Sequence, residues 1–525
     1  MTSRLNGHAT APPGSEHREP AERLPHAPEP LLSELSVAGR EGQHLPAPDV
    51  PASGLPDAGL LRDGLPLPEL SEPEVVRHFT RLSQLNYAVD TGFYPLGSCT
   101  MKYNPKIDDE MAALSGFAGL HPYQPAETVQ GALRLMWELE RALAAITGFA
   151  AVTLQPAAGA HGELTGMLMI RAHHLARGDT RRRRVLVPDS AHGTNPATAA
   201  MCGYEAVTVP SDARGNVDLT ALRGLLGPDV AALMITVPST LGLFDEHMLE
   251  VTAAVHETGA LVYGDGANLN ALLGIARPAD LGLDVLHINL HKTFAQPHGG
   301  GGPGAGPVAV RADLEPYLPL PVVRRRPDET YDLDYIRPHS IGQVRAFGTH
   351  FGVLVRAYTY IRLLGGDGLR RVSEAAVLHA NYLRAVLREW YDVPYDRPCM
   401  HEVLLSGRRQ KAQGARTLDV AKRLIDYGFH PPTIYFPLVV DEALMIEPTE
   451  TEAKPTLDAF IAAMAAIAVE AARAPAVLHA APHDTPVGRL DEASAARQPV
   501  LRWRRADAPA LAGTAGASAV GTAKA

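Results

Sequence analysis

Lys292 has the surroundings that best suit covalent chemistry in this 525-residue chain. It follows an apolar run, residues 286–290, and stands next to His291, with the glycine-rich tract 298–304 just beyond. A lysine in this setting is not expected to be an ordinary surface charge. It is typical of an amine held in a protected pocket, where it could form a Schiff base with an aldehyde cofactor.

Two further polar residues follow apolar runs that resemble buried strands. Asp265 comes after residues 261–264, and His192 lies just beyond residues 185–188. Ligands of open parallel sheets bind outside the carboxyl ends of the strands, so these side chains could converge on Lys292. A carboxylate, an imidazole and an amine are what a pyridine aldehyde cofactor needs. Taken singly, Asp265 would be read as a helix cap and His192 as a structural histidine.

Small residues at 157–160 offer a site for a phosphate group. They precede a helical pattern over residues 164–176, and free amides at a helix start attract anions. A plain loop-to-helix junction explains the same residues. The glycines of 299–306 are not a Walker loop, because no Gly-Lys-Ser/Thr follows; we expect them to form a mobile wall beside Lys292.

Metal binding is not expected at His287, His291 and His298, because no His-Glu-x-x-His spacing is present. The arginine run 181–184 is expected to cap a loop before a strand and to stay solvated.

The middle of the chain alternates between strand and helix patterns, which predicts a parallel α/β sheet. Short apolar runs predict strands at 185–187, 231–237, 260–263 and 285–288, and apolar spacing predicts helices at 127–147 and 246–258. Beyond residue 365 we predict helices at 369–391 and 419–427, a strand at 402–406 and a possible strand at 438–440. The predicted domains are therefore a large one at 76–365 and a smaller α+β one at 366–480. The flanks, 1–75 and 481–525, are low in complexity and predicted to be mostly disordered tails.

Composition excludes several classes of protein. An apolar fraction of 46% and a charged fraction of 20% are typical of a soluble globular protein, and the net charge of -10 provides no footprint for nucleic acid. Three sparse cysteines, Cys99, Cys202 and Cys399, suggest reduced thiols. No apolar stretch reads as a membrane span or signal peptide, so we expect a cytoplasmic protein.

Several long motifs resemble the P-protein of the glycine cleavage system, glycine dehydrogenase (decarboxylating). The similar stretches, which lie between about residues 85 and 475, are 94–106, 189–196, 265–271, 289–294, 427–433 and 447–450. Only one of the family's two homologous halves is present, the half with the lysine, so the chain resembles subunit 2. Residues 347–351 fit the pattern less well, which leaves the roles of Thr349 and His350 open, and the Pro-rich N-terminal tail lies outside it.

This resemblance implies the aspartate aminotransferase-like fold type I of pyridoxal-phosphate enzymes, with pyridoxal 5'-phosphate bound to Lys292. It implies that Asp265 supports the ring nitrogen and that His192 stacks on the ring. The phosphate would meet the amides of Ala158, Gly159 and Ala160. The remaining neighbours that it implies are Thr194, Asn195, Asn268 and His291. The implied partners are subunit 1, in a heterotetramer with two copies of each subunit, the lipoylated H-protein and glycine.

Two other functions are compatible with the residues. One is another fold type I enzyme, such as an amino acid decarboxylase or a carbon-carbon lyase, because a shared fold does not determine the reaction. The other is a non-catalytic scaffold subunit that binds the lipoyl carrier. The joint presence of Lys292, Asp265 and His192 disfavours the scaffold, which has no need of them.

Overall fold

The computed structural model describes residues 29–42, 46–51, 54, 56–61, 65, 67–121, 124–298, 304–346 and 348–501. Two compact units are distinguished, and the larger one, Ala27–Pro482, contains both of the main sheets. Of the other unit, only residues 483–501 are described. They include helix α16 (Glu492–Arg497), whose N-cap Asp491 accepts a hydrogen bond from the Ser494 amide at 2.9 Å.

A seven-stranded sheet forms the centre of the larger unit, in the order β1-β7-β6-β5-β4-β2-β3. The pairs β2–β3, β2–β4, β4–β5 and β5–β6 are parallel, whereas β7 runs antiparallel to both β1 and β6. The mainly parallel sheet predicted from the apolar runs is therefore confirmed. Its strands are β1 (Ala151–Thr153), β2 (Arg184–Pro188), β3 (Glu205–Val209), β4 (Val230–Thr236), β5 (Leu261–Gly266), β6 (Val285–Ile288) and β7 (Val308–Val310).

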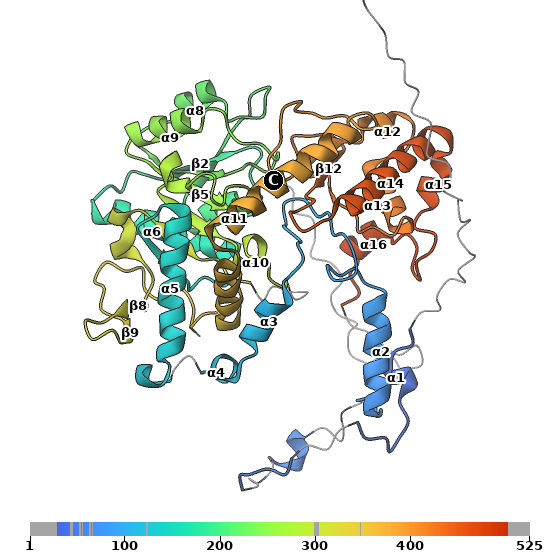
Figure 1. Cartoon of the computed structure of the whole chain (residues 1–525), viewed down its shortest axis with the longest axis horizontal. Helices are drawn as coiled ribbons and strands as arrows, with labels where there is room; N and C mark the ends of the chain where they lie inside the picture. The colour runs from blue at the N-terminus through green and yellow to red at the C-terminus, as the bar shows by residue number, and fades with distance from the viewer. Residues whose placement is uncertain are drawn as a thin grey trace, which may run out of the picture. The chain divides into compact units, whose positions relative to one another are not determined.

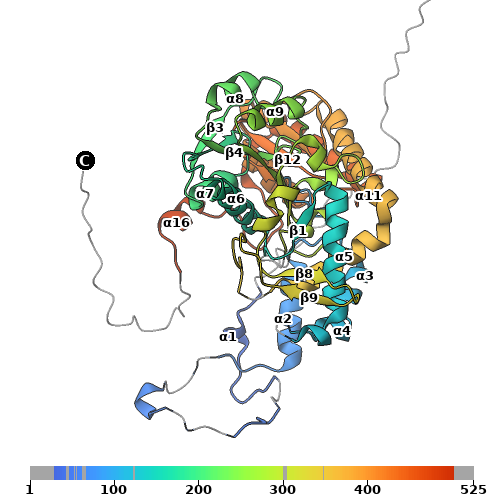
Figure 2. The ribbon, with the colours of Figure 1, turned by 90° about the vertical axis from the view of Figure 1, so that its left-hand side faces the viewer.

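Helices cover both faces of this sheet because its strands are apolar on both sides. Along β4, Leu233 and Ile235 pack into one core, and Ala232 and Met234 into the other. The first core includes side chains of α5 (Gln130–Thr147), α8 (Leu219–Leu225) and α9 (Met248–Glu257). The second includes side chains of α6 (Gly159–Ala176) and α7 (Thr194–Met201), and Figures 1 and 2 show these helices around the strands. Helix α5 ends at Gly148, with φ 81°, as its sequence predicts.

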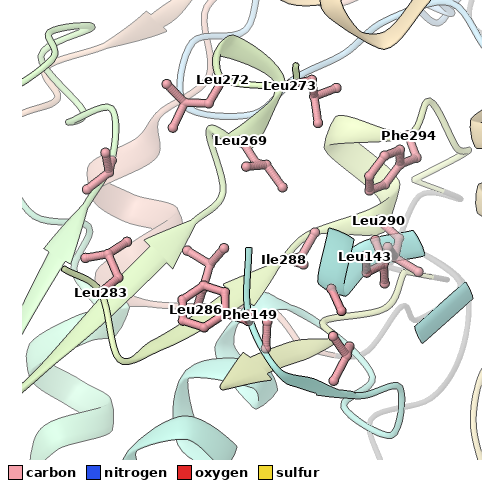
Figure 3. Packing of buried hydrophobic residues seen from close by; sticks show 14 of the residues in the cluster. Leu143, Phe149, Leu269, Leu272, Leu273, Leu283, Leu286, Ile288, Leu290 and Phe294 are labelled. Carbon is pink, nitrogen blue, oxygen red and sulfur yellow. The ribbon is translucent and has the colours of Figure 1, made fainter. Parts of the chain in front are cut away.

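The first core anchors the stretch that carries Lys292. Ile288, Leu290 and Phe294 have no exposed surface, and they belong to the same core as Leu143 of α5 and Leu269 in the 3-10 turn η3 (Leu269–Ala271). Figure 3 shows these apolar side chains gathered around the end of β6. These buried side chains fix the position of the turn that carries Lys292.

The arginine run before β2 is solvated as predicted at Arg181 and Arg183, which are exposed, but not at Arg182. The Arg182 side chain is only 9% exposed. Its guanidinium donates to Asp179 at 2.7 Å, to the Thr258 carbonyl at 2.9 Å and to the Val230 carbonyl. It therefore ties the loop before β2 to the start of β4 and the end of α9, an arrangement that only the sheet order creates.

Helix α11 (Phe351–Leu387) joins the large sheet to the smaller domain, and it starts and ends earlier than the predicted 369–391. Gly365 breaks it, with φ 60° and ψ -174°. Residues before and just after the break, such as Leu354 and Leu369, pack into the first core, whereas Ala380 to Leu387 pack into the small domain.

A second sheet is three-stranded and antiparallel, in the order β10-β12-β11, formed by β10 (Val403–Ser406), β11 (Thr433–Ile434) and β12 (Ala443–Ile446). We call the part of the same compact unit around this sheet the small domain. The possible strand at 438–440 is wrong: these residues form a turn, and Leu438 is 88% exposed. Pro437 ahead of it has no N–H to donate, and 443–446 make the pairing instead. Helix α13 (Thr417–Asp426) fulfils the prediction for 419–427.

Helix α14 (Lys454–Arg473) is, among the described residues, the one helix long and apolar enough to pass a test for a membrane span. Its apolar side chains Leu457, Phe460 and Met464 are nevertheless buried in the core of the small domain. The other elements of the described chain are α1 (Leu32–Leu35), η1 (Ala58–Leu60), α2 (Glu72–Gln84), α3 (Lys106–Ala112), α4 (Ser115–Ala118), η2 (Ala126–Thr128), η4 (Pro278–Leu281), α10 (Leu290–Thr293), η5 (Ala312–Tyr317), β8 (Val322–Arg325), β9 (Tyr331–Asp334), α12 (Arg408–Ala412) and α15 (Pro475–Ala480).

Candidate active site

Lys292 lies in α10, a single helical turn that begins two residues after β6 ends. The extended conformation expected up to residue 290 therefore stops at Ile288, and Asn289 becomes the N-cap of the turn. The half-buried Lys292 Nζ donates a hydrogen bond of 3.0 Å to the carbonyl of Ser98, from a segment almost two hundred residues earlier in the chain.

Asp265 lies at the end of β5, directly beside His287 of β6 in the register of the two strands. Its carboxylate is 2% exposed and accepts hydrogen bonds from the Ala267 amide at 3.0 Å and the Asn195 amide group at 3.2 Å. The Nε2 atom of His287 lies 3.4 Å from Asp265 Oδ1. Burial raises the pKa of Asp265, but His287 and the two donors outweigh it and hold the pKa below its ordinary value. Asp265 is therefore a buried carboxylate that stays ionised.

His287 is kept in place by a second contact. Its Nδ1 atom lies 2.7 Å from the Tyr263 hydroxyl, and both side chains are fully buried. Because the tyrosine can donate to Nδ1, Nε2 is left to carry a proton toward Asp265.

Glu163 of α6 is a member of the site that the sequence analysis missed. It accepts hydrogen bonds from the Thr194 hydroxyl at 2.6 Å and from the Asn195 amide group at 3.0 Å. Burial, and then the charge of Asp265, raise the pKa of Glu163. Glu163 is the one acidic residue of α6, and that was the signal that could have identified it.

His192 is exposed and lies at the outer end of this network. Its Nδ1 atom is 2.9 Å from the Thr194 hydroxyl, and its ring is 5.9 Å from that of Phe436. A continuous set of contacts thus leads from His192 through Thr194, Glu163 and Asn195 to Asp265. The structure thus connects the sequence-predicted residues His192, Thr194, Asn195 and Asp265, with Glu163 between them.

The start of α6 meets the Lys292 turn. Ala158 is its extended N-cap, and Gly159 and Ala160 begin the helix. A Cβ atom added to Gly159 would lie 2.5 Å from Asn289 Oδ1, so only glycine allows this close approach. The first amides of an 18-residue helix, which attract anions, therefore lie next to the turn that holds Lys292.

Asn268 and His291 have other contacts. The buried Asn268 donates to the Pro238 carbonyl at 2.9 Å. Burial, together with the charges of His298 and Lys292, lowers the pKa of His291 to about 3, so this imidazole is neutral. His298 Nε2 lies 2.8 Å from the His291 carbonyl. The predicted mobile wall falls mostly on residues 299–303, outside the described residues.

Thr349 and His350, whose roles the sequence left open, contact backbone near the start of α6. The Thr349 hydroxyl donates to the Leu154 carbonyl at 2.9 Å, and His350 Nδ1 lies 2.5 Å from the Gly304 carbonyl. They connect the approach to α11 with the strands that flank the site.

A second set of charged residues that the sequence analysis did not assign faces Lys292 from the small domain. His401 and Glu402 precede β10, and Glu447 follows β12; none of the three has any exposed surface. A carboxylate oxygen of each glutamate and a ring nitrogen of His401 lie within 4.8 Å of one another. Burial lowers the pKa of His401 to about 3 and raises the pKa of Glu447 to about 7. Burial, together with the charge of Glu447, raises the pKa of Glu402 well above its usual value.

Two protein families match separate parts of the chain. Residues 48–332 match the glycine cleavage system P-protein family, and residues 372–483 match the C-terminal domain of glycine dehydrogenase. A protein of Halalkalibacterium halodurans, described as a probable glycine dehydrogenase (decarboxylating) subunit 2, is 60% identical over 479 residues, which cover 90% of this chain and 98% of that one. A protein of Desulforamulus reducens with the same description is 59% identical over 480 residues, covering 90% and 99%.

Solved structures show the same fold. A glycine decarboxylase (P-protein) of the glycine cleavage system, in inhibitor-bound form, superposes with a TM-score of 0.66 at 23% identity, covering 78% of this chain and 93% of that one. A cysteine desulfurase from Thermococcus onnurineus NA1 superposes with a TM-score of 0.57 at 16% identity, covering 72% and 95%. The predicted fold type I architecture, with its mainly parallel sheet, is confirmed.

Proposed function

The chain belongs to the glycine cleavage system P-protein family, as a subunit 2 of glycine dehydrogenase (decarboxylating), and from this membership we propose how its residues serve that reaction. The family activity is the decarboxylation of glycine. We propose that Lys292 holds pyridoxal 5'-phosphate and that the aminomethyl group left by decarboxylation passes to the lipoyl arm of the H-protein. A separate subunit 1, in a cytoplasmic heterotetramer with two copies of each subunit, completes the proposal.

One observation supports this assignment above the others. A lysine amine from the turn after β6, a buried ionised carboxylate from the end of β5 and the amide end of the long helix α6 all lie at the carboxyl ends of the central strands. Each of these groups would bind a different part of the same cofactor: the amine its aldehyde, the carboxylate its ring nitrogen and the helix amides its phosphate. A scaffold subunit has no need for this combination.

Unsatisfied polar atoms around Lys292 fit a polar ligand. Among the described residues, Asn195 Oδ1, Asn289 Oδ1 and His291 Nδ1 are buried without a hydrogen-bond partner. A buried polar atom left unpaired costs about 1–3 kcal/mol, so several together indicate a site meant to be filled. The close approach at Gly159 keeps the start of α6 free of any side chain. The unpaired amide oxygens support a bound group that carries O–H or N–H donors, and the open start of α6 supports a phosphate.

Asp265 would hold a proton on the ring nitrogen of this cofactor. Because its pKa lies below the ordinary value, the carboxylate is ionised at neutral pH and favours a cationic partner. Asn195, Ala267 and His287 keep the carboxylate in place. When bound, pyridoxal phosphate supplies the electron sink that accepts the electron pair left as carbon dioxide departs.

The start of α6 would bind the phosphate through the amides of Ala158, Gly159 and Ala160, aided by the helix dipole. His192, at the exposed end of the network, would cover the ring from the solvent side, and Thr194 would orient that imidazole. Asn195, Asn268 and His291 would complete the wall of the pocket.

The test is the variant Lys292→Ala, with Lys454→Ala, an exposed lysine of α14, as its control. Lys292→Ala should lose the visible absorbance of the lysine-bound cofactor. It should also lose isotope exchange between carbon dioxide and the glycine carboxyl group in the presence of the lipoylated H-protein. Lys454→Ala should retain both. Survival of absorbance and exchange in Lys292→Ala would refute the role of this lysine.

A further inference from the structure

The segment Gly97, Ser98, Cys99 and Thr100 passes over the Lys292 amine and is held at every residue. The Gly97 amide donates to the Met445 carbonyl at 3.2 Å, and Cys99 Sγ lies 3.7 Å from His298 Nδ1. Ser98 adopts φ 62°, a left-handed conformation that is uncommon for a residue with a side chain. Such a conformation persists where surrounding contacts over-determine it, and it often marks a functional constraint.

Two glutamates hold this segment from the small domain. Glu402 Oε2 accepts a 2.7 Å hydrogen bond from the Ser98 amide, and Glu447 Oε1 accepts a 2.6 Å hydrogen bond from the Thr100 hydroxyl. They flank β10 and β12, which pair with Val403 opposite Ile446, so the sheet itself sets them side by side. Ser98 thus has its amide bound to Glu402 and its carbonyl bound to Lys292.

Each glutamate keeps a second oxygen that these bonds do not use. Glu402 Oε1 and Glu447 Oε2 are buried and have no hydrogen-bond partner within the described part of the chain. Two carboxylates this close and this deeply buried cannot both be ionised at moderate cost, because like charges repel strongly where water is excluded.

The other titratable groups around the pair leave Lys292 as its counter-charge. Lys102 also faces Glu447, but it is already paired with Glu450 at 2.9 Å. His401 is neutral, and burial raises the pKa of the Cys99 thiol, which therefore stays protonated. Asp265 is a further carboxylate whose charge interacts with Lys292, and it has His287 as its direct partner at 3.4 Å. A glutamate pair that carries one negative charge, not two, therefore matches the single lysine cation.

We propose that Glu402 and Glu447 are positioning residues that share one proton and present a single negative charge to the Lys292 amine. Their remaining oxygens hold the segment 97–100, so that the Ser98 carbonyl receives this amine whenever it is not bound covalently. The free lysine is thereby fixed in one place beside this negative charge. This inference rests on the proposed role of Lys292 and adds the groups that control its free amine.

The test measures how fast an acylating reagent labels Lys292 in the cofactor-free full chain, as a function of pH, by peptide mass spectrometry. Glu402→Gln and Glu447→Gln should each leave the midpoint of this pH profile nearly unchanged, because the remaining carboxylate loses the shared proton and keeps the charge. The double variant removes that charge. Its midpoint should fall by at least about one pH unit, or about tenfold faster labelling at a fixed pH below the midpoint.

Two patterns would overturn the shared proton. If the midpoint of the labelling profile shifted equally in both single variants and the two shifts added up in the double variant, each glutamate would carry its own charge. No shift in any of the three would mean an uncharged pair. If the double variant does not fold, infrared spectra decide: the protonated-carboxyl band assigned to the pair should be lost in each single variant. A band unchanged in either one would refute the sharing.

Positioning is tested separately by Glu402→Ala, which removes the acceptor for the Ser98 amide. Labelling of Lys292 should accelerate at least about tenfold, the effect of losing one charged hydrogen bond, whereas Glu402→Gln keeps an acceptor and should stay within about twofold. The control is Glu140→Gln, a buried carboxyl of α5 that does not touch the segment. Equal rates in Glu402→Ala and the unchanged chain would refute the positioning role. None of these readouts requires the cofactor, so they can fail independently of the proposed function.

Discussion

Asp265→Asn is the perturbation that examines the site most directly. The change keeps the shape of the side chain and removes a charge that is 2% exposed. It also replaces an acceptor by a donor. If the new amide oxygen keeps the Ala267 bond, its NH2 group faces the NH2 group of Asn195 across 3.2 Å.

The side-chain amide of Asn195 can rotate by half a turn to avoid this contact, because its Oδ1 has no partner among the described residues. That turn would place an oxygen against Glu163 and lose a 3.0 Å hydrogen bond. The local cost is therefore one or two hydrogen bonds, roughly 1–3 kcal/mol. The larger loss concerns the reaction. A charge pair at a separation of about 4 Å is worth about 4 kcal/mol at a moderate effective dielectric, or about a thousandfold in rate.

The assay is isotope exchange between carbon dioxide and the glycine carboxyl group, with lipoylated H-protein and saturating cofactor, alongside the visible absorbance that reports loading. The matched control is Asp284→Asn, a buried aspartate just before β6, at the opposite end of the same strands. Asp284→Asn should lower the unfolding temperature but leave exchange within a few-fold. If loaded Asp265→Asn kept more than about a tenth of the exchange rate, Asp265 could not be the group that holds the ring proton.

Three further outcomes are expected. Gly159→Ala should weaken cofactor binding at least about tenfold in an absorbance titration, because its Cβ would lie 2.5 Å from Asn289 Oδ1 and must displace that side chain; unchanged affinity would count against the phosphate site. Thr194→Val should disturb the ring environment of His192, seen as a shifted absorbance of the loaded protein, because it removes the hydroxyl between His192 and Glu163; an identical spectrum would contradict the network. Burial raises the pKa of Glu140 to about 8, so the folded chain binds a proton there that the unfolded chain releases above an ordinary value of 4.5. The contribution of this group to the free energy of unfolding is therefore complete at low pH and is lost between about pH 4.5 and 8, at up to about 1.4 kcal/mol per pH unit. Glu140→Gln should reduce this dependence of the free energy of unfolding on pH, as measured by denaturant titrations.

The local sequence pattern was sufficient to predict the strands that position Lys292 and Asp265. Continuous apolar runs predicted β2, β4, β5 and β6, because strands covered on both faces need apolar side chains throughout. The same runs located Lys292 and Asp265 at strand ends. The short strands β1 and β7 and the largely exposed β3 were not predicted, since three buried residues or a polar edge strand carry too weak a pattern.

Long-range packing decided the rest. The Arg182 side chain became buried because Val230 and Thr258 come to lie beside it, and the predicted strand at 438–440 lost its pairing to Ala443–Ile446. No spacing within the chain relates these segments.

The sequence by itself determined that Lys292 lies just beyond a buried strand, that Asp265 lies at the end of another, and that small residues open a helix. These are local facts, set by hydrophobic periodicity and by residues that start or stop helices. Only the tertiary structure decided that Glu163 joins Asp265 through Asn195, and that Glu402 and Glu447 face the Lys292 amine. The physical reason is that the order of strands and the packing of the two domains determine which buried charges meet, and residues far apart in the chain carry no local sign of that meeting.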